Sequence, residues 1–234
     1  LNGAYSKYKS HELGASVIKE TLNRTKLDPK KIDEVIMGQV LTGLTGQNPA
    51  RQSAINANIP IDKTAYVVNQ VCGSGLRSVA AAYQSILLND AKIIVAGGQE
   101  SMSNSTEEAM LKDGLIDAYK NYHMGITAEN VAEKFQVTRE DQDNFAFESQ
   151  EKALKAQKEK KFLKEIIDFK IKSKKAEINF NVDEHPREGV NLDSLKRLKP
   201  EVGTWPQQKL KKIQKLQILT SLDFKIRLPK LLKT

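Results

Sequence analysis

Apolar residues in the first hundred positions follow helical and strand periods in turn. The first predicted helix ends at Pro29 and carries apolar residues at helical spacing, namely Leu13, Val17, Ile18 and Leu22. Two more helices are predicted, one from Pro49 through Ile59 and one after Cys72, and short apolar or β-branched runs predict strands at residues 34–40, 65–69 and 92–96. This alternation predicts an α/β fold with a parallel sheet.

Two details of the pattern make more specific predictions. The third helix carries its larger apolar residues along one face: Leu76, Val79, Ala80, Tyr83, Ile86 and Leu87. The run at residues 92–96 is continuously apolar and leads into Gly97 and Gly98. A run of this kind is typical of a parallel strand that is buried on both faces, so we expect a buried strand here.

From Ser101 onward the sequence becomes helical, polar and rich in lysine. Thr138, followed by two acidic residues, is typical of a helix start, and we expect that helix to run to Lys158. Residues 152–175 hold 10 lysines, which form either a solvated helix face or a surface that attracts a phosphorylated ligand.

The last segment, residues 201–234, fits neither period well. It is rich in lysine and carries a three-spaced apolar stripe at Leu210, Ile213, Leu216, Leu219 and Leu222. A basic amphipathic helix of this kind could rest on a membrane surface or on a partner protein. The alternative is a tail that takes no part in the fold.

Composition and charge exclude several classes of protein. With 39% hydrophobic and 28% charged residues the chain is globular in composition, and no apolar run is long enough for a membrane span. The net charge is +8, but residues 201–234 alone carry 8 basic and 2 acidic groups. The rest of the chain is nearly balanced, which argues against a nucleic-acid surface within the fold. A single cysteine forms no internal disulfide, so we expect an intracellular protein.

Cys72 lies between a predicted strand and a predicted helix, and Gly73 and Gly75 follow it closely. The first turn of a helix presents unpaired N–H groups and a partial positive charge, which favour a thiolate and can hold a developing oxyanion. A lone cysteine is also often a small buried apolar residue. From the residues alone, both a nucleophile and a core position stay open.

The segment around Cys72 resembles the nucleophile motif of the thiolase family, in particular of its acetyl-CoA acetyltransferases. That motif reads NQVCGSGLRS at residues 69–78. The resemblance covers about residues 2–200, and it continues through GQNPAR at 46–51, AGGQESMS at 96–103, YHMGITAEN at 122–130 and DEHPRE at 183–188.

The resemblance implies roles for four residues. Cys72 matches the nucleophile that takes an acetyl group from acetyl-CoA, before a second acetyl-CoA attacks it to give acetoacetyl-CoA. Its backbone N–H would donate to the oxyanion. Leu115, His123 and Met124 match residues that line the pantetheine and acyl channel, although His123 taken by itself could be a hydrogen-bonded, helix-packing histidine. Coenzyme A thioesters are substrates here, so no cofactor and no metal ion are implied.

The resemblance also implies a three-part organisation. Residues 1–100 match an incomplete thiolase N-terminal α/β domain with a mixed, mainly parallel sheet, and residues 101–200 match a mostly helical loop region that contacts coenzyme A. Residues 201–234 depart from the family as a basic tail. The family sheet is expected to have five strands with the first one central, and that strand would precede Leu1. Its loss would leave unpaired groups on both neighbours, at about 1–3 kcal/mol for each buried group.

Thiolases build their site from two similar halves, and only one half is matched. The Gly-His-Pro histidine, the second cysteine and the Asn-Glu-Ala-Phe motif of the other half have no match, since His185 follows Glu184 and belongs to the loop region. Two functions stay open: an impaired acetyl-CoA C-acetyltransferase, and a non-catalytic module that binds coenzyme A or associates with a thiolase. We expect a cytoplasmic location and, as in the family, a homo-oligomer, with neither nucleic acid nor membrane as a partner.

Overall fold

The computed structural model describes residues 3–172 and 177–199, and its centre is a three-stranded parallel sheet. The strand order is β2-β1-β3, with bounds β1 Glu34–Gly38, β2 Thr64–Val68 and β3 Ile94–Gly98. Ile36 of β1 pairs with Tyr66 on one side and with Ala96 on the other. The predicted α/β fold and parallel sheet are confirmed. No antiparallel member of this sheet lies among the described residues.

The sheet corrects two expectations about strand position. The strand predicted to be fully buried is β3, yet it forms an edge of the described sheet and is only partly buried, whereas Val35 and Ile36 of β1 are fully buried. The expectation that a central strand is lost is also wrong for this part of the sheet. Because β1 pairs directly with both neighbours, the three strands leave no gap for a missing one.

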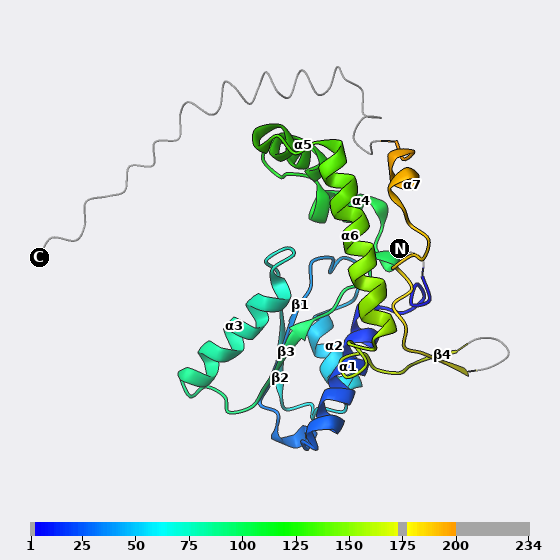
Figure 1. The fold of residues 1–234 in the computed structure, drawn as a ribbon. Coiled ribbons are helices and arrows are strands. Elements are labelled where there is room, and N and C mark those ends of the chain that lie inside the picture. The colour runs from blue at the N-terminus through cyan, green and yellow to red at the C-terminus, as the bar shows by residue number, and fades with distance from the viewer. Residues whose placement is uncertain (1–2, 173–176, 200–234) are drawn as a thin grey trace, which may run out of the picture.

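Helices cover the two faces of the sheet unequally. Figure 1 shows α1 and α2 on one side of the strands and α3 on the other. The bounds are α1 Ser10–Thr25, α2 Pro49–Asn56 and α3 Ser74–Leu87, with a short 3-10 turn, η1, at Pro29–Lys31. All three predicted helices are present, but α2 ends at Asn56 instead of continuing through Ile59, and a turn then leads to β2.

The face of α3 that meets the sheet is not its predicted apolar stripe. The buried residues of α3 are small: Ser74, Ser78 and Ala82. The Ser78 hydroxyl donates to the Gly97 carbonyl at 2.7 Å, so the helix lies close to β3. The larger apolar side chains point outward, and Leu76 is 78% exposed. Within the described residues, α3 therefore presents an uncovered apolar face.

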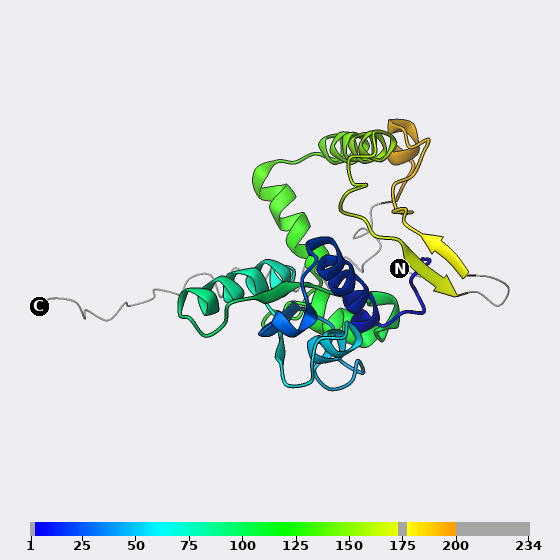
Figure 2. The same cartoon turned by 90° about the horizontal axis from the view of Figure 1, so that it is seen from below.

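The region after β3 is mostly helical, as predicted, and Figure 2 shows it lying beside the α/β body rather than within the sheet. Its elements are η2 Met102–Asn104, α4 Glu107–Met110, the π-helix η3 Leu111–Leu115, α5 Met124–Phe135, α6 Arg139–Lys158, β4 Phe169–Lys172, β5 Glu177–Phe180 and α7 Leu192–Lys196. The antiparallel hairpin of β4 and β5 was not predicted from the sequence.

Helix α6 confirms the predicted helix start at Thr138. The Thr138 hydroxyl accepts from the backbone N–H of Asp141, and the Asp141 carboxylate accepts from the backbone N–H of Thr138. The Thr138 hydroxyl also donates to the Asp141 carboxylate at 2.6 Å, and this bond, with the one from the Thr138 N–H, holds the pKa of Asp141 below its ordinary value. At the same helix end, the Arg139 guanidinium donates to Asp143 and to the carbonyls of Leu195 and Leu198, which fixes α7 against α6.

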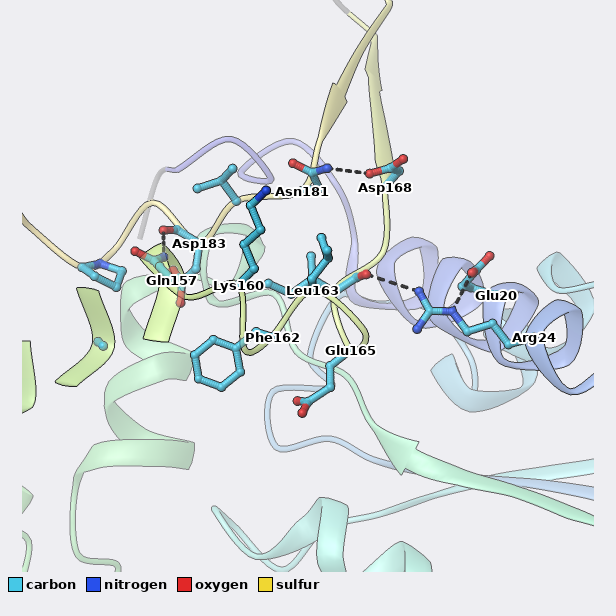
Figure 3. Close-up of a pocket in the computed structure, with 14 residues that line it drawn as sticks. Glu20, Arg24, Gln157, Lys160, Phe162, Leu163, Glu165, Asp168, Asn181 and Asp183 are labelled. Atoms are coloured by element: carbon cyan, nitrogen blue, oxygen red, sulfur yellow. Dashed lines mark hydrogen bonds and ion pairs between the residues drawn. The ribbon is translucent and has the colours of Figure 1, made fainter. Parts of the chain in front are cut away.

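The hairpin region contacts the first helix and the N-terminal segment. Arg24 of α1 donates to the carbonyls of Lys164 and Ile166, and the rings of Tyr5 and Tyr8 meet Phe169 edge to face. A cavity of about 860 Å³ lies between α1, the end of α6 and the hairpin (Figure 3). Its lining mixes apolar with acidic and basic side chains, among them Glu20, Arg24, Lys160, Phe162, Leu163 and Asp183.

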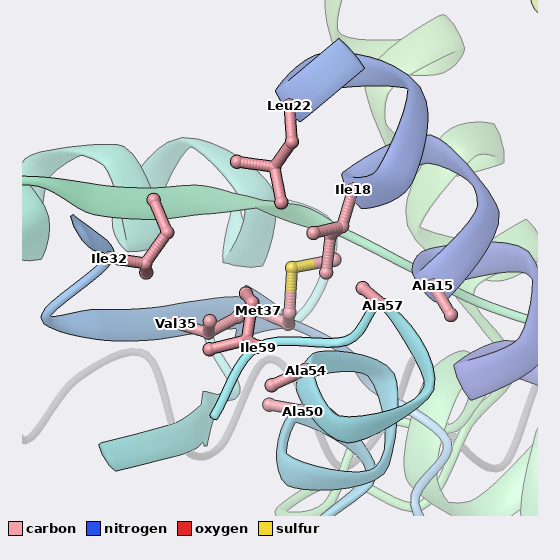
Figure 4. Packing of buried hydrophobic residues seen from close by; sticks show 10 residues of the cluster. All are labelled: Ala15, Ile18, Leu22, Ile32, Val35, Met37, Ala50, Ala54, Ala57 and Ile59. Atoms are coloured by element: carbon pink, nitrogen blue, oxygen red, sulfur yellow. The ribbon is translucent and has the colours of Figure 1, made fainter. Parts of the chain in front are cut away.

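The hydrophobic core lies between the sheet and the α1–α2 face. Figure 4 shows Met37 of β1 at its centre, facing Ile18 and Leu22 of α1 and the alanines of α2. The small residues Ala50 and Ala54 let α2 approach β1 closely, and Gly14 lets α1 approach the Gln99 side chain. The core is thus built from the apolar side chains of β1, the larger apolar side chains of α1 and the small alanines of α2.

The Asp33 carboxylate ties the start of β1 to the start of β3. It accepts from the backbone N–H groups of Lys92 and Ile93 at 2.8 and 3.0 Å, while the Asp33 N–H donates to the Ile93 carbonyl. The two backbone bonds hold the pKa of Asp33 below its ordinary value of 3.8. A depressed pKa in the folded state means that the stabilising contribution is present above the unfolded pKa and is lost as pH falls through the folded one.

We therefore expect Asp33→Asn to lower the free energy of unfolding at neutral pH and to lose this effect in acid. Urea denaturation of both proteins at several pH values measures it, and the difference between them should shrink below about pH 4. A difference that stays constant from neutral pH into acid would contradict the role assigned to the carboxylate.

Candidate active site

Cys72 lies on the turn between β2 and α3, two residues before the helix begins at Ser74. Its side chain is exposed, and within the described residues no hydrogen bond or ion pair reaches the sulfur. The turn is at the carboxyl end of β2, the edge of a parallel sheet where ligands of open α/β proteins bind. The structure therefore favours the nucleophile over a core position for this cysteine.

Ser74 anchors the turn that carries Cys72. Its hydroxyl accepts from the backbone N–H of Gln70 at 2.9 Å and donates to the Val71 carbonyl at 2.6 Å. The side chain of Gln70 in turn accepts from Arg77 of α3 at 2.5 Å. Since Ser74 is buried, these bonds fix the two residues before the cysteine relative to the first turn of the helix.

Val71 adopts a left-handed backbone conformation, with φ of +49°. This region is unfavourable for a β-branched residue, and such strain is found mostly where surrounding contacts hold it in place. The Val71 N–H donates to the side-chain oxygen of Asn69, and the Ser74 hydroxyl donates to the Val71 carbonyl, so these two bonds supply those contacts. The outcome is a sharp turn that leaves the next side chain, Cys72, pointing outward.

The carboxyl ends of β1 and β3 allow α3 to begin this close to the sheet. A Cβ atom at Gly38 would lie 2.4 Å from the carbonyl carbon of Ser74 and 2.5 Å from the nitrogen of Gly75. On the other strand, Gly98 packs against Gly75 without side chains between them. Gly38 is therefore needed for the position of the helix end next to Cys72, whereas a Cβ at Gly98 would meet Gly75 at an ordinary contact distance of 3.5 Å.

We expect Gly38→Ala to destabilise the protein by about 1–3 kcal/mol, because the methyl group meets backbone that cannot move aside freely. The midpoint and slope of urea unfolding measure this change. Gly43→Ala is the matched control, since nothing lies within 4 Å of a Cβ there, and it should leave the midpoint unchanged. Equal effects of the two substitutions would show that the close approach at Gly38 is not a constraint.

Glu100 supports the same edge of the sheet. One oxygen of its carboxylate accepts from the backbone N–H groups of Val40 and Leu41 at 2.9 and 3.2 Å, and the other is buried without a partner among the described residues. This carboxylate therefore holds the segment that leaves β1. Next to it, the buried amides of Gln39 and Gln99 bond to each other at 3.0 Å.

Leu115, His123 and Met124 are brought together by a turn in the loop region. Ile116 and His123 form an antiparallel bridge, and Asp117 donates to the Tyr122 carbonyl at 2.9 Å, so Leu115 lies opposite Met124. The His123 ring caps α5, with its Nδ1 accepting from the N–H of Gly125 at 3.0 Å. One ring nitrogen of His123 is thus hydrogen-bonded to its own helix, as expected for a hydrogen-bonded, helix-packing histidine. The role of His123 toward a substrate stays a prediction.

The structure thus groups these three residues with one another around the turn between η3 and α5. The cavity of about 860 Å³ is lined by neither Cys72 nor any of the three, so it is separate from the candidate site. In the lysine cluster, Lys152, Lys155 and Lys161 are exposed and paired with glutamates. These three lysines fit the solvated-face alternative.

Sequence reasoning missed the residues that hold the turn in place. Ser74, Gln70 and Glu100 act through single hydrogen bonds to backbone groups that lie elsewhere in the fold, and such bonds leave no periodic signal. In residues 3–172 and 177–199, no group of three or more His, Cys, Asp or Glu side chains is placed to hold a metal ion. The same residues include no helix long and apolar enough to cross a membrane.

Comparison with known proteins gives a family and a fold that agree with the structure described above. The family model described as "Thiolase, N-terminal domain" matches residues 1–110 and 104–204, and the two matches overlap at residues 104–110. An acetyl-CoA acetyltransferase of Rhizobium meliloti is 50% identical over 216 residues, covering 86% of this chain and 55% of the relative. A cytosolic acetyl-CoA acetyltransferase of Rattus norvegicus is 46% identical, with 86% and 54% covered.

A solved structure agrees in three dimensions. The crystal structure of the Bacillus anthracis acetyl-CoA acetyltransferase superposes with a TM-score of 0.81 at 32% identity, covering 86% of this chain and 55% of that one. The α/β fold of this chain is thus shared with a solved acetyl-CoA acetyltransferase. This chain belongs to the thiolase family. It spans about half the length of the curated relatives it matches.

Proposed function

We propose that this chain carries out the acyl-accepting half of a thiolase reaction, with acetyl-CoA as the donor and Cys72 as the acceptor. The observation that carries the proposal is the exposed sulfur of Cys72 at the amino end of α3, on a turn fixed by Ser74. The names of the similar proteins supply the substrate class, a thioester of coenzyme A. Leu115, His123 and Met124 are proposed to contact the pantetheine and acyl group, as the resemblance implies.

The transfer step follows from the chemistry of a thiolate and a thioester. The Cys72 thiolate attacks the carbonyl carbon and forms a new S–C bond, and the carbonyl oxygen becomes an oxyanion at the amino end of α3, where the helix carries a partial positive charge. When this intermediate collapses, the bond to the sulfur of coenzyme A breaks and the coenzyme A thiolate leaves with the electron pair. The product is an acetyl thioester on Cys72.

Completing the condensation needs a base for the α-proton of a second acetyl-CoA. The described histidines hold other places in the fold: His11 lies on α1 beside Asn56, His123 caps α5, and the backbone N–H of His185 donates to Asp183. The family motifs that carry the base have no match in this sequence. We therefore propose that the chain alone stops at the acetyl-enzyme stage.

Release of coenzyme A tests this function. Mixing the chain with acetyl-CoA should give a burst of free coenzyme A close to one equivalent, followed by no steady turnover and no acetoacetyl-CoA. Absence of the burst would contradict the proposed acyl transfer. Steady formation of acetoacetyl-CoA would contradict the proposed stop at the acetyl-enzyme.

A second candidate function is association with an intact thiolase without catalysis. The uncovered apolar face of α3 favours it, because a contiguous exposed apolar patch marks an interaction surface. Size-exclusion chromatography with an acetyl-CoA acetyltransferase of full length tests it: co-elution supports association, and separate elution removes this candidate. A homo-oligomer and a cytoplasmic location complete the proposal, the latter because two of the relatives are named cytosolic.

A further inference from the structure

The turn that carries Cys72 offers few N–H groups to an oxyanion. The N–H of Gly73 donates to the Gln70 carbonyl at 3.1 Å, and the N–H of Ser74 donates to the Val71 carbonyl at 3.1 Å. Both groups are thus taken up within the turn. In acyl transfer, preorganised donors aimed at the developing oxyanion are usually the largest single source of stabilisation. A side-chain donor close to Cys72 would therefore add to the stabilisation that its own N–H supplies.

The side-chain amide of Gln70 lies next to the residue that follows Cys72. Apart from its chain neighbours, the three heavy atoms nearest to the position of a Cβ at Gly73 all belong to Gln70. They are the carbonyl oxygen at 3.4 Å, the amide nitrogen Nε2 at 3.7 Å and the amide carbon Cδ at 4.0 Å. The main chains of Gln70 and Cys72 also form a short bridge. Because Gly73 has no side chain, nothing of that residue fills the space between the Gln70 amide and the amino end of α3.

Arg77 of α3 sets the orientation of this amide. Its Nε donates to the Gln70 Oε1 at 2.5 Å. Because a guanidinium only donates, the oxygen of the amide has to face Arg77, and Nε2 with its two N–H groups is left on the side of Gly73. Among residues 3–172 and 177–199, no acceptor takes a hydrogen bond from Nε2. The amide is thus oriented by the same helix whose amino end it lies next to.

A donor at this position favours the tetrahedral intermediate over the bound thioester. The oxygen is a neutral carbonyl in the thioester and carries a negative charge in the intermediate, and a hydrogen bond to a charged acceptor is about twice as strong as one to a neutral acceptor. Both Gln70 and Cys72 are exposed, so water also solvates the oxyanion. The expected effect of this donor is therefore about tenfold in rate, below the loss of about 100- to 1,000-fold found in enclosed sites.

We propose that the side-chain amide of Gln70 is a second donor, together with the N–H of Cys72, to the oxyanion formed during acetylation of Cys72. Nε2 donates a hydrogen bond to the oxygen while it carries the charge and transfers no proton, so the bonds made and broken are those of the acyl transfer described above. Gln70 is thus a catalytic residue, and Arg77 is the positioning residue that orients it. This inference rests on the proposed function and adds the side chain that stabilises the charge.

The ratio of two rate constants for the same thiol tests this role. One is the rate constant of the coenzyme A burst with acetyl-CoA, and the other is that of alkylation by iodoacetamide, which loses iodide from carbon and forms no oxyanion. A change in the amount of thiolate acts on both rate constants, whereas a lost oxyanion donor lowers only the first. We expect Gln70→Glu, which keeps an acceptor for Arg77, and the uncharged Gln70→Met each to lower the ratio about tenfold.

Gln84→Glu is the matched control, because this exposed glutamine lies near the other end of α3, and the ratio should stay unchanged. An unchanged ratio in both Gln70 variants, with a burst in every protein, would overturn the role of Gln70 and leave the acyl transfer standing. A fall in Gln70→Glu alone would show charge repulsion instead of a lost donor and would also contradict the role. No burst in the unmodified chain would contradict the proposed function itself, and the role of Gln70 with it.

Discussion

Replacement of Cys72 by alanine is expected to abolish the acetyl label that the chain retains after exposure to radiolabelled acetyl-CoA. The sulfur is the atom that forms the new bond, so its removal leaves no acceptor at the amino end of α3. Retained label is measured after denaturation, and treatment with hydroxylamine separates a labile thioester from a stable lysine amide. The loss should be complete for the labile fraction.

Cys72→Ser is the control for the fold. Because Cys72 is exposed and its sulfur makes no described hydrogen bond, serine should leave circular dichroism and urea unfolding unchanged. A surviving hydroxylamine-labile label in Cys72→Ala would place the acceptor elsewhere in the chain. Unfolding of Cys72→Ser would instead mean that the cysteine is needed for the structure.

Met37→Ala is expected to produce the largest loss of stability, about 2–5 kcal/mol, because it empties the centre of the core. Met37 is 2% exposed and lies between β1 and the two helices α1 and α2. Domains of this kind have only about 5–15 kcal/mol of stability in total, so much of the fold's margin would be lost. Urea unfolding followed by circular dichroism measures the change.

Met102→Ala supplies the matched control. This methionine is 43% exposed in the short turn after β3, and its truncation should change the free energy of unfolding by no more than about 0.5 kcal/mol. If both substitutions cost the same, the cluster around Met37 is not the dominant core of the protein.

The alternation of periods was enough to predict the order of elements and the parallel sheet, because hydrophobic spacing is a local property of the sequence. Which strand lies at the centre was not predictable in the same way. The apolar run that became β3 resembles a buried strand, yet its neighbours are set by pairings between residues about sixty positions apart. The capped start of α6 was predictable, because its signal lies within four consecutive residues.

The face of α3 shows a different limit of sequence analysis. Spacing identifies two faces on the helix but not which one meets the sheet. Here Ser74, Ser78 and Ala82 face the strands, because only small side chains permit the approach of Gly75 to Gly98. The larger apolar face therefore points outward. The β4–β5 hairpin was missed for a similar reason, since alternating lysines in a polar region resemble a solvated helix.

The candidate site likewise has one part that could be predicted from the sequence and one part that could not. Cys72 was identified from its place between a strand, two glycines and a helix, and the structure leaves it exposed there. The left-handed backbone of Val71 had no sequence signal, because valine rarely adopts it. The bonds from Ser74 that hold this conformation depend on the fold of the turn. The grouping of Leu115 with His123 and Met124 came from resemblance, and the bridge between Ile116 and His123 explains it.

Mass spectrometry of peptides from the chain after brief incubation with acetyl-CoA tests the central claim most directly. An exposed thiol at the amino end of α3 should carry one acetyl group, bound as a thioester to Cys72, well before any lysine is modified. An unmodified Cys72 peptide, or acetyl groups found only on lysines, would contradict the assignment of this cysteine as the acyl acceptor.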